Sequence, residues 1–369
     1  MDIKVITRHA PSNYGSLLQS IATQTVLERL GHTCEIIDYI RDDEHGLKAV
    51  TTSLNGKQGW NGNPLKKLAY IALRYPEEKK AELKFSRMRK KYLKLTGRCR
   101  THEDLRLLDA DAFMTGSDQV WGPLLNGNFD SAYFLSFVSK KPKVAFASSF
   151  GKTDFTDTIV KEYKRYLSEY SFITVREDTA AAMLKQWGIP CVGQILDPTL
   201  ILSEKDWERM AKQVKTPKQY VLVYQIHNDN RLGDYAQRLA RNIGLPLLRM
   251  SPFLHQISRE GKLKLLPSLG EFLYYIKHCS YFITDSFHGT AFALNFNKDF
   301  IEVLPNTSTG SRNLSILRLT KLENRIVSDF NDFSLINEKI NYEEVNSILY
   351  EQRKLSLEKI ESILSALHT

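Results

Sequence analysis

The chain has 369 residues, of which 42% are hydrophobic and 25% are charged, a composition typical of soluble globular proteins. One hydrophobic core rarely serves a chain of this length, so we expect two domains. The formal net charge of +9 indicates attraction to phosphate, anionic sugars, nucleic acid or a membrane surface, without choosing among them. No internal repeat or low-complexity tract stands out.

The cysteine pattern argues against a disulfide framework and against a zinc site. The four cysteines lie far apart and include no C-x-x-C pair. No spacing of His, Asp or Glu demands a metal, so we expect neither a metal nor a cofactor. Residues 1–6 are too short for the apolar region of a signal peptide, and no apolar run approaches a membrane span. These features predict a cytoplasmic, reduced protein.

The chain opens with a βαβ pattern. Residues 3–6 and 34–38 predict strands, and apolar residues at helical spacing over 17–30 predict a helix that Gly31 ends. The turn at residues 13–16 precedes this helix and lacks a G-x-G-x-x-G dinucleotide fingerprint. This turn either lines a ligand cleft or is a plain structural turn.

A polar insertion and a basic helix are expected next. Residues 41–65 are rich in glycine and asparagine, Gly56 among them, which predicts an exposed insertion. Over residues 77–95 an apolar stripe recurs at helical spacing, and the other face is basic. This stripe consists of Ala81, Phe85, Met88, Tyr92 and Leu95. Such a helix could lie on an anionic membrane surface, or its stripe could simply pack inside the protein.

Three further predicted strands each end in polar residues. The strands cover residues 112–115, 143–147 and 172–175, and the last precedes a helix over 179–187. Ligands of open α/β sheets bind at the carboxyl edge of the strands. The polar ends are Gly116-Ser117-Asp118-Gln119-Val120-Trp121, Ser148-Ser149-Phe150-Gly151 and Arg176-Glu177-Asp178. Their repeated placement predicts a ligand site at that edge.

The second half of the chain repeats the α/β pattern after a passage over residues 194–200. The expected strands cover 220–226, 246–250, 281–284 and 300–304, and the expected helices cover 232–243, 269–278 and 343–367. We therefore predict an α/β protein with two Rossmann-like domains and an interdomain cleft, a GT-B-like architecture. The predicted boundaries are 1–195, with a variable helical insertion over 41–110, then 196–345, and a C-terminal helix over 346–369.

The stretch from Tyr281 to Thr290 is the central candidate site. A buried strand ends at Asp285-Ser286, and a helical pattern resumes at Ala291. A helix N-terminus at a sheet edge holds anions well. With an ordinary pKa near 6.5, His288 could act there as an acid or base, or bind phosphate as a cation. The alternative is a turn whose histidine only caps the backbone.

Six segments together resemble the polysaccharide pyruvyl transferase family, in order over about residues 10–305. The segments are Asn13-Tyr14-Gly15-Ser16 with Leu18-Gln19, then Gly116-Ser117-Asp118-Gln119-Val120-Trp121, Ser149-Phe150-Gly151, Val175-Arg176-Glu177, Leu196-Asp197-Pro198-Thr199, and Thr284-Asp285-Ser286-Phe287-His288-Gly289-Thr290. The resemblance implies a GT-B-like fold. It also implies transfer of a pyruvyl group from phosphoenolpyruvate to a sugar of a cell-surface polysaccharide or its lipid-linked precursor, forming a ketal across two hydroxyls.

The resemblance also assigns site residues. The donor's phosphate and carboxylate call for cations and backbone N–H groups. The implied donor-binding residues are Arg176, Ser286, Phe287, His288, Gly289 and Thr290. The implied acceptor-binding residues are Asn13, Tyr14, Gly15, Ser117 and Trp121. His288 and Asp118 are the implied catalytic residues, although Asp118 could instead cap a following helix.

One position departs from the family pattern. Characterised members typically carry an arginine two residues before this histidine, and Ser286 stands there in this chain. The departure leaves the donor open to another anionic compound. Other residues that could supply the missing charge are Arg249, Lys298, Arg312 and Arg318.

Two other functions stay open beside pyruvyl transfer. One is a GT-B-type glycosyltransferase that uses a nucleotide sugar in polysaccharide synthesis. The other is a polysaccharide- or membrane-binding scaffold that kept the fold without the chemistry. Nucleic-acid binding is disfavoured, because the basic residues come without an aromatic platform or a recognised motif. The expected partners are phosphoenolpyruvate and a lipid-linked sugar, with a peripheral contact at the inner face of the membrane left open.

Overall fold

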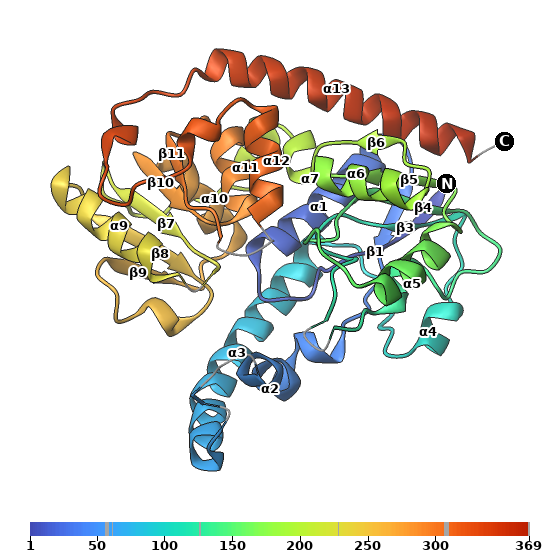
Figure 1. Ribbon diagram of the computed structural model, residues 1–369. Coiled ribbons are helices and arrows are strands. Elements are labelled where there is room, and N and C mark those ends of the chain that lie inside the picture. Colours follow the sequence, from blue (N-terminus) through green and yellow to red (C-terminus); the bar gives the residue numbers. More distant parts are fainter. Residues whose placement is uncertain (56–58, 61, 125–126, 228, 306–309, 368–369) are drawn as a thin grey trace. The chain divides into compact units, whose positions relative to one another are not determined.

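A computed structural model describes residues 1–55, 59–60, 62–124, 127–227, 229–305 and 310–367 (Figure 1). Gly56 of the predicted insertion and residues 368–369 of the predicted C-terminal helix lie outside the described residues. The chain divides into unit 1, Met1–Pro198 with Leu357–Thr369, and unit 2, Thr199–Ser356. The first division therefore falls three residues after the predicted one, and the C-terminal helix is shared by the units instead of forming a segment of its own.

The described part of unit 1 contains one parallel sheet of six strands in the order β2-β1-β3-β4-β5-β6. The strands are β1 (Asp2–Ile6), β2 (Thr33–Ile36), β3 (Ala112–Thr115), β4 (Lys143–Ser148), β5 (Phe172–Val175) and β6 (Gly193–Gln194). β1 pairs with β2 on one side and with β3 on the other, so the direction of winding reverses between β1 and β3. At such a switch point the connecting loops diverge and leave room for a ligand.

The helices of unit 1 differ most from prediction around the insertion. They are α1 (Tyr14–Arg29), α2 (Gly46–Asn55), α3 (Pro64–Tyr92), α4 (His102–Arg106), α5 (Asp157–Leu167), α6 (Asp178–Trp187), the boundary helix α7 (Pro198–Ile201), and the short 3-10 helices η1 (Asp42–Glu44) and η2 (Ser131–Phe134). α2 falls inside the predicted polar insertion, because Val50 and Leu54 are buried against Tyr70 of α3. The predicted helix over 77–95 is only the C-terminal part of α3.

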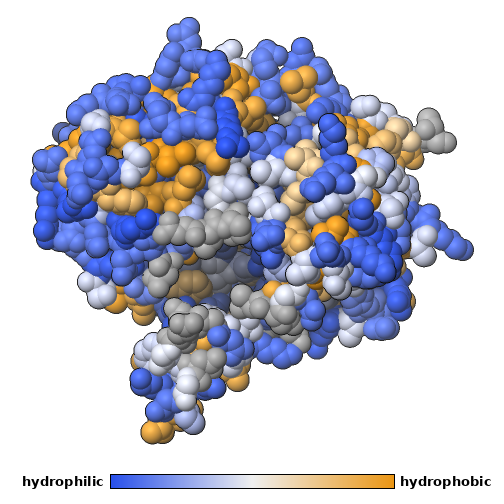
Figure 2. Space-filling view, in the orientation of Figure 1, coloured by the Kyte–Doolittle hydropathy of each residue, from blue (hydrophilic) through white to orange (hydrophobic). Residues whose placement is uncertain are grey.

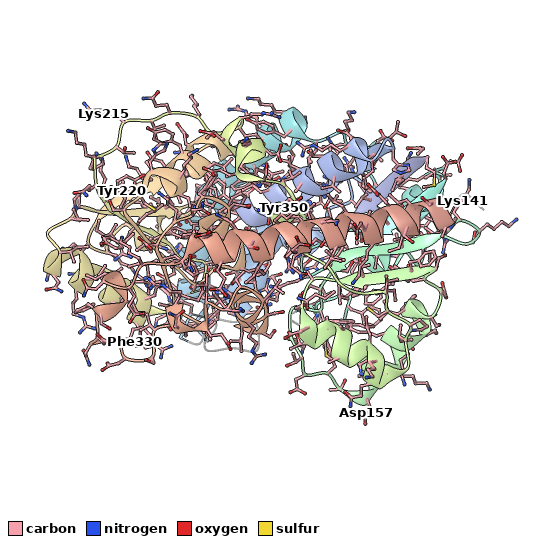
Figure 3. The ribbon with its side chains drawn as sticks, turned by 90° about the horizontal axis from the view of Figure 1, so that it is seen from above. Lys141, Asp157, Lys215, Tyr220, Phe330 and Tyr350 are labelled. Carbon is pink, nitrogen blue, oxygen red and sulfur yellow. The ribbon has the colours of Figure 1, made fainter. Side chains whose placement is uncertain are left out.

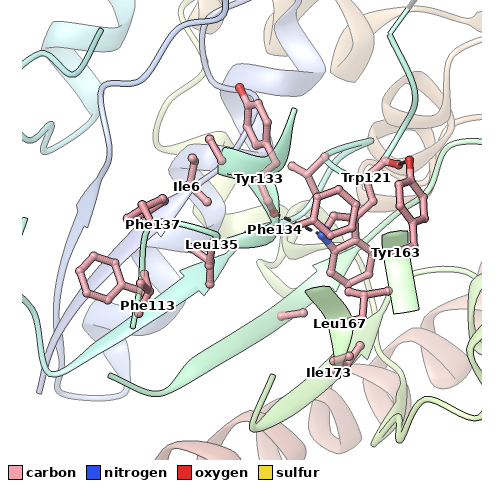
Figure 4. Packing of buried hydrophobic residues seen from close by; sticks show 14 of the residues in the cluster. Ile6, Phe113, Trp121, Tyr133, Phe134, Leu135, Phe137, Tyr163, Leu167 and Ile173 are labelled. Carbon is pink, nitrogen blue, oxygen red and sulfur yellow. Dashed lines mark hydrogen bonds between the residues drawn. The ribbon is translucent and has the colours of Figure 1, made fainter. Parts of the chain in front are cut away.

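The core of unit 1 includes a dense aromatic cluster (Figure 4). The Trp121 ring lies 5.0 Å from the Phe150 ring and 6.0 Å from the Phe134 ring, centroid to centroid. Its indole Nε1–H donates to Tyr133 O at 3.3 Å, and Tyr163 Oη donates to Trp121 O at 2.5 Å (Figure 4). This packing fixes the segment that follows β3, and that segment carries part of the candidate site.

The described part of unit 2 contains a parallel sheet of five strands in the order β11-β10-β7-β8-β9. The strands are β7 (Val221–Tyr224), β8 (Leu247–Ser251), β9 (Lys262–Leu265), β10 (Tyr281–Thr284) and β11 (Phe300–Glu302). The switch point lies between β7 and β10. Sequence analysis missed β9, because this edge strand is short and alternates lysine with leucine between polar loops.

Helices cover both faces of the unit 2 sheet (Figure 1). They are α8 (Glu204–Glu208), α9 (Asn230–Asn242), α10 (Leu269–His278), α11 (Phe287–Asn295), α12 (Ser311–Leu319), α13 (Tyr342–Ala366), and the short η3 (Leu254–Gln256), η5 (Glu323–Arg325) and η6 (Ser334–Ile336). Leu232 and Tyr235 of α9 share a core cluster with Val221 and Val223 of β7. On the opposite face, the Tyr224 ring lies 5.0 Å from Phe272 of α10.

The C-terminal helix α13 is continuous over 25 residues and carries the exposed Tyr350 (Figure 3). Its last part packs on unit 1, where Lys359 Nζ donates to Gln194 O at 3.2 Å. Within the part of the chain that the structure describes, every helix is too short or too polar to cross a lipid bilayer.

Candidate functional site

A polar cluster follows the strands at the switch point of each sheet. In unit 1 the cluster surrounds Asp118, which follows β3, and Arg8, which follows β1. In unit 2 it surrounds Asp285 and His288, which follow β10. The placement is the one that the carboxyl-edge argument predicts for ligand sites.

Asp118 occupies a strained position at the end of β3. Its φ angle is +77°, in the left-handed region that residues other than glycine rarely adopt. Ser16 Oγ donates to Asp118 Oδ2 at 2.6 Å, and the Gln119 N–H donates to Oδ1 at 2.8 Å. The alternative that Asp118 caps a helix is wrong, since residues 119–124 form no helix. The residue is 6% exposed, and these hydrogen bonds hold its carboxylate in one orientation.

Arg176 lies deep in the same cluster instead of facing a ligand. Its side chain is 0% exposed. Nη1 lies 2.9 Å from Asp197 Oδ2, Nη2 lies 3.5 Å from Asp118 Oδ1, and Nε lies 3.5 Å from Glu177 Oε2. Burial lowers the pKa of Arg176, but the three carboxylates more than offset burial and raise it. Arg176 is therefore surrounded by carboxylates, one of which is Asp118, and its predicted role in donor binding stays a prediction.

The unit 1 cluster carries more acid than base around Arg176. Ser117 Oγ donates to Asp197 Oδ2 at 2.8 Å, and Ser149 Oγ donates to Glu177 Oε1 at 2.7 Å. An excess of carboxylates repels phosphate and suits hydroxyl groups, which donate hydrogen bonds to them. The cluster is therefore suited to a sugar more than to an anionic donor.

Arg8 is a member of this cluster that sequence analysis missed. Its Nε donates to Glu44 Oε1 at 2.8 Å. Burial lowers the pKa of Arg8, whereas the charges of Glu44 and Asp118 raise it. The signal that could have found Arg8 is its position two residues after β1, at the same sheet edge as Asp118.

Several predicted acceptor residues have structural roles. Asn13 is the N-cap of α1, and its side chain accepts from the N–H groups of Gly15 at 2.8 Å and Ser16 at 3.4 Å. Tyr14 is fully buried, with its ring 5.0 Å from Phe85 of α3. Trp121 is fully buried in the aromatic cluster. Tyr14 and Trp121 are thus core residues in this structure, and their predicted role in acceptor binding stays a prediction.

Asp285 ties the two central strands of unit 2 together at their carboxyl ends. Its Oδ1 accepts from the Ile226 N–H at 2.8 Å, and its Oδ2 accepts from the His227 N–H at 3.0 Å. His227 Nδ1 also lies 3.3 Å from Asp285 Oδ2. These bonds fix the loop after β7 against the loop after β10, so the switch point has a defined shape.

His288 lies in the first turn of α11, which begins four residues earlier than predicted. Ser286 is the N-cap, and its Oγ accepts from the Gly289 N–H at 3.2 Å. A Cβ on Gly289 would lie 3.1 Å from Thr284 Cβ and closer still to Thr284 Oγ1, so only glycine fits there. His288 is 6% exposed, and its ring centroid lies 5.2 Å from that of Phe287. The positive end of the helix dipole lies at this turn.

Glu302 is a buried carboxyl group that connects β11, α11 and α12. Its Oε2 lies 2.5 Å from Thr290 Oγ1, and its Oε1 accepts from Asn313 Nδ2 at 2.6 Å. Burial and the charge of Asp285 raise the pKa of Glu302 to about 8, against the two hydrogen bonds, which lower it. A protonated Oε2 would donate to Thr290 Oγ1, whose own hydrogen then goes to Ser286 O at 3.1 Å. The geometry accommodates a neutral Glu302.

We expect Glu302→Gln to stabilise the protein increasingly as pH rises. The unfolded pKa of about 4.5 is lower than the folded pKa of about 8. The stability that the neutral form contributes is therefore complete below pH 4.5 and is lost as pH rises to 8, by about 1.4 kcal/mol per pH unit. Glutamine keeps both hydrogen bonds without this loss. Urea unfolding of both proteins across this window measures the effect, and a pH-independent difference between them would contradict it.

Of the four cations that could replace the arginine missing at Ser286, Arg312 lies on α12, which contacts α11. It is buried in the first turn of α12, beside the Asn313 that binds Glu302. Arg249 instead donates to Glu260 O and Gly233 O at 2.6 and 3.0 Å. Arg318 is half exposed and pairs with Glu323, and Lys298 precedes β11 at the opposite edge of the sheet.

Unit 1 also contains two adjoining cavities that sequence analysis did not predict. One has a volume of about 540 Å³ and the other about 710 Å³, and both are lined by Ile40 and Arg100. Both are lined by segments of the predicted insertion over 41–110 and by residues that follow β2, and the larger one also by residues 124 and 129–131. Among the described residues, no group of three or more His, Cys, Asp or Glu side chains could hold a metal ion.

The fold and the two edge clusters define an α/β protein with two Rossmann-like domains of the GT-B type. The family model for polysaccharide pyruvyl transferases matches residues 13–308. The chain therefore belongs to the polysaccharide pyruvyl transferase family, a family of transferases that act on polysaccharides. A comparison with curated proteins finds no match.

Solved structures with the same fold have low sequence identity to this chain. The UDP-GlcNAc 2-epimerase of Methanocaldococcus jannaschii, in complex with UDP-GlcNAc and UDP, is 14% identical, with a TM-score of 0.51 over 99% of this chain and 100% of that one. The S. aureus MnaA–UDP structure is 12% identical, with a TM-score of 0.50 over 95% and 90% of the two chains. These likenesses confirm the predicted fold class. The predicted cleft between the two domains stays a prediction.

Proposed function

We propose that this protein transfers the pyruvyl group of phosphoenolpyruvate to a sugar of a cell-surface polysaccharide or its lipid-linked precursor, forming a ketal. The observation that carries the proposal is the first turn of α11. There His288 lies at a helix N-terminus, the buried Glu302, whose pKa is raised to about 8, contacts Thr290, and Arg312 lies on the adjoining α12. This combination suits a small donor with a phosphate and a carboxylate.

The proposed reaction balances without a cofactor. Carbon 2 of the donor forms two C–O bonds to sugar oxygens, and its bond to the phosphate oxygen breaks. One hydroxyl proton reaches carbon 3, which becomes a methyl group, and the other leaves with phosphate. The reaction requires an acid near the donor and a base near the sugar hydroxyls. We assign the first role to His288 and the second to Asp118.

Arg176 and Ser117 support the proposed base instead of binding substrate. Ser117 and Arg176 both donate hydrogen bonds to Asp197, and Arg176 also contacts Asp118. A carboxylate held in this way stays oriented while it accepts a proton. Of the residues assigned to the donor by resemblance, Ser286, Phe287, Gly289 and Thr290 build the turn around His288.

A peripheral membrane contact is proposed for the outer face of α3. The apolar stripe over 81–95 packs inward, with Ala81, Phe85 and Met88 buried. The exposed apolar residues lie mostly nearer the start of the helix, where Leu65 is 77%, Leu68 65% and Leu73 71% exposed. Figure 2 shows hydrophobic surface among hydrophilic residues at the projecting end of the α2–α3 pair. Lysines beside these leucines suit anionic headgroups, and use of phosphoenolpyruvate would require the cytoplasmic side.

Incubation with phosphoenolpyruvate and a panel of lipid-linked and nucleotide-linked sugars tests the proposal. We expect phosphate release together with a pyruvyl mass gain on one acceptor. Failure of every acceptor, together with no detectable binding of phosphoenolpyruvate, would overturn it.

A GT-B-type glycosyltransferase is the second candidate, and Ser286 in place of the family's arginine is the observation that favours it. Ligands that bind the folded state raise its melting temperature. Stabilisation by a nucleoside diphosphate and none by phosphoenolpyruvate would favour this second candidate.

A further inference from the structure

The smaller of the two cavities in unit 1 has strongly basic walls. It has a volume of about 540 Å³ and lies between the end of β2, the last turns of α3 and the segment over 95–100. Its charged lining residues are Asp38, His45, Arg89, Lys90, Arg98 and Arg100. Among these lining residues one carboxylate, that of Asp38, stands beside four arginine or lysine side chains, so the cavity has a positive potential.

Arg89 is a buried cation in this wall with limited compensation. The residue is 6% exposed, and its Nη1 donates to Ala10 O at 2.8 Å. Burial and the charge of Arg98 lower the pKa of Arg89, and the charges of Asp38 and Glu82 act against them without offsetting them. A guanidinium has five N–H donors, and a buried charge is stable only when it is paired. An anion in the cavity would complete the pairing.

Two consecutive residues, Arg8 and His9, link the cavity wall to the Asp118 cluster along the chain. His9 Nε2 lies 3.2 Å from Asp38 Oδ1 in the cavity wall. The preceding residue, Arg8, pairs with Glu44 and is close enough to Asp118 for its charge to raise the pKa of Arg8. Consecutive Cα atoms are about 3.8 Å apart. The cavity wall and the Asp118 cluster therefore lie in neighbouring parts of unit 1.

We propose that this basic cavity binds the diphosphate group that links the acceptor sugar to its carrier. The inference rests on the proposed function and specifies its acceptor as a sugar diphosphate ester. Arginine guanidinium groups bind phosphoryl oxygens in pairs, and several of them match two successive phosphoryl groups better than one carboxylate. The adjoining cavity of about 710 Å³ continues from the shared wall at Ile40 and Arg100 and offers room for the rest of the molecule.

Calorimetric titration of the full chain with inorganic pyrophosphate tests the site. The variant is Arg98→Gln with Arg100→Gln, since Arg100 is exposed and the Arg98 side chain is 35% exposed, so that the fold should tolerate both changes. We expect pyrophosphate to bind at least about tenfold more weakly to this double variant. The matched control is Arg106→Gln with Arg165→Gln, two exposed arginines of unit 1 outside the cavity. Equal affinity of wild type, variant and control would overturn the proposal.

Two further ligands distinguish the carriers. Uridine diphosphate represents a nucleotide carrier, and farnesyl diphosphate represents an isoprenoid lipid carrier. Weakened binding of either in the double variant supports a diphosphate site, and the tighter ligand identifies the carrier. If neither is weakened, the site does not bind diphosphate esters. These titrations need no phosphoenolpyruvate. The proposal for the cavity can therefore be overturned while the proposed pyruvyl transfer stands, and the proposed pyruvyl transfer can be overturned while the cavity proposal stands.

Discussion

Replacing Asp118 with asparagine is expected to lower kcat by about 10²- to 10⁴-fold, the usual contribution of a positioned general base. Asparagine tolerates the positive φ of this position better than most residues. Its amide can keep the hydrogen bonds to Ser16 and to the Gln119 N–H. Arg176 retains Asp197 and Glu177, so we expect stability to fall by no more than about 1–2 kcal/mol. The loss should therefore be catalytic.

The kinetics of phosphate release with a saturating acceptor measure this effect. Asp111→Asn is the matched control, because Asp111 is an exposed aspartate at the opposite end of the same strand. Its activity should match wild type. If Asp118→Asn retained more than about a tenth of the wild-type kcat, the base would have to be another group.

His288→Gln is expected to have the second large effect, a loss of about 10²-fold or more in kcat/KM for phosphoenolpyruvate. Glutamine approximates the size of imidazole and can donate a hydrogen bond. It cannot carry a proton to carbon 3 or hold a positive charge beside the donor phosphate. The first turn of α11 should persist, because its N-cap is Ser286 and its close packing depends on Gly289.

The pH profile of kcat/KM distinguishes the role of His288 from mere packing. A group that titrates in the wild type produces one limb of the profile, and the glutamine variant should lack that limb. The matched control is His278→Gln, an exposed histidine at the amino-end edge of the same sheet. A wild-type pH profile in His288→Gln would exclude proton transfer by this residue, and catalysis would then have to be assigned to a group other than His288.

Regular elements with strong apolar patterns were predictable from the sequence. The strands at Ala112–Thr115, Phe172–Val175 and Tyr281–Thr284 coincide with the predicted ranges. Their residues are mostly apolar, aromatic or β-branched, as expected for strands buried on both faces. Helix starts were less predictable, since Ser286 and Asn13 act as caps and begin α11 and α1 earlier than the apolar spacing suggests.

The prediction of an amphipathic helix was right about the buried apolar stripe of α3, but it missed the first part of the helix and the apolar residues exposed there. The prediction began at residue 77, whereas α3 begins at Pro64, and Pro76 lies within the helix. A proline inside a helical pattern usually marks a helix boundary, and Pro76 therefore hides the continuity of the two halves of α3 in the sequence. Packing of α2 on Tyr70 stabilises that half against the weak local signal.

The sequence by itself determined the α/β class, the family, and the placement of polar residues at the carboxyl ends of the strands. These are local properties, because strand ends and motifs are each contained in a few consecutive residues. The tertiary structure alone decided which side chains meet. Arg176 contacts Asp118, 58 residues away, and the basic cavity is lined by residues from separate segments of unit 1. Burial and charge pairing depend on such distant neighbours, and no pattern along the chain records them.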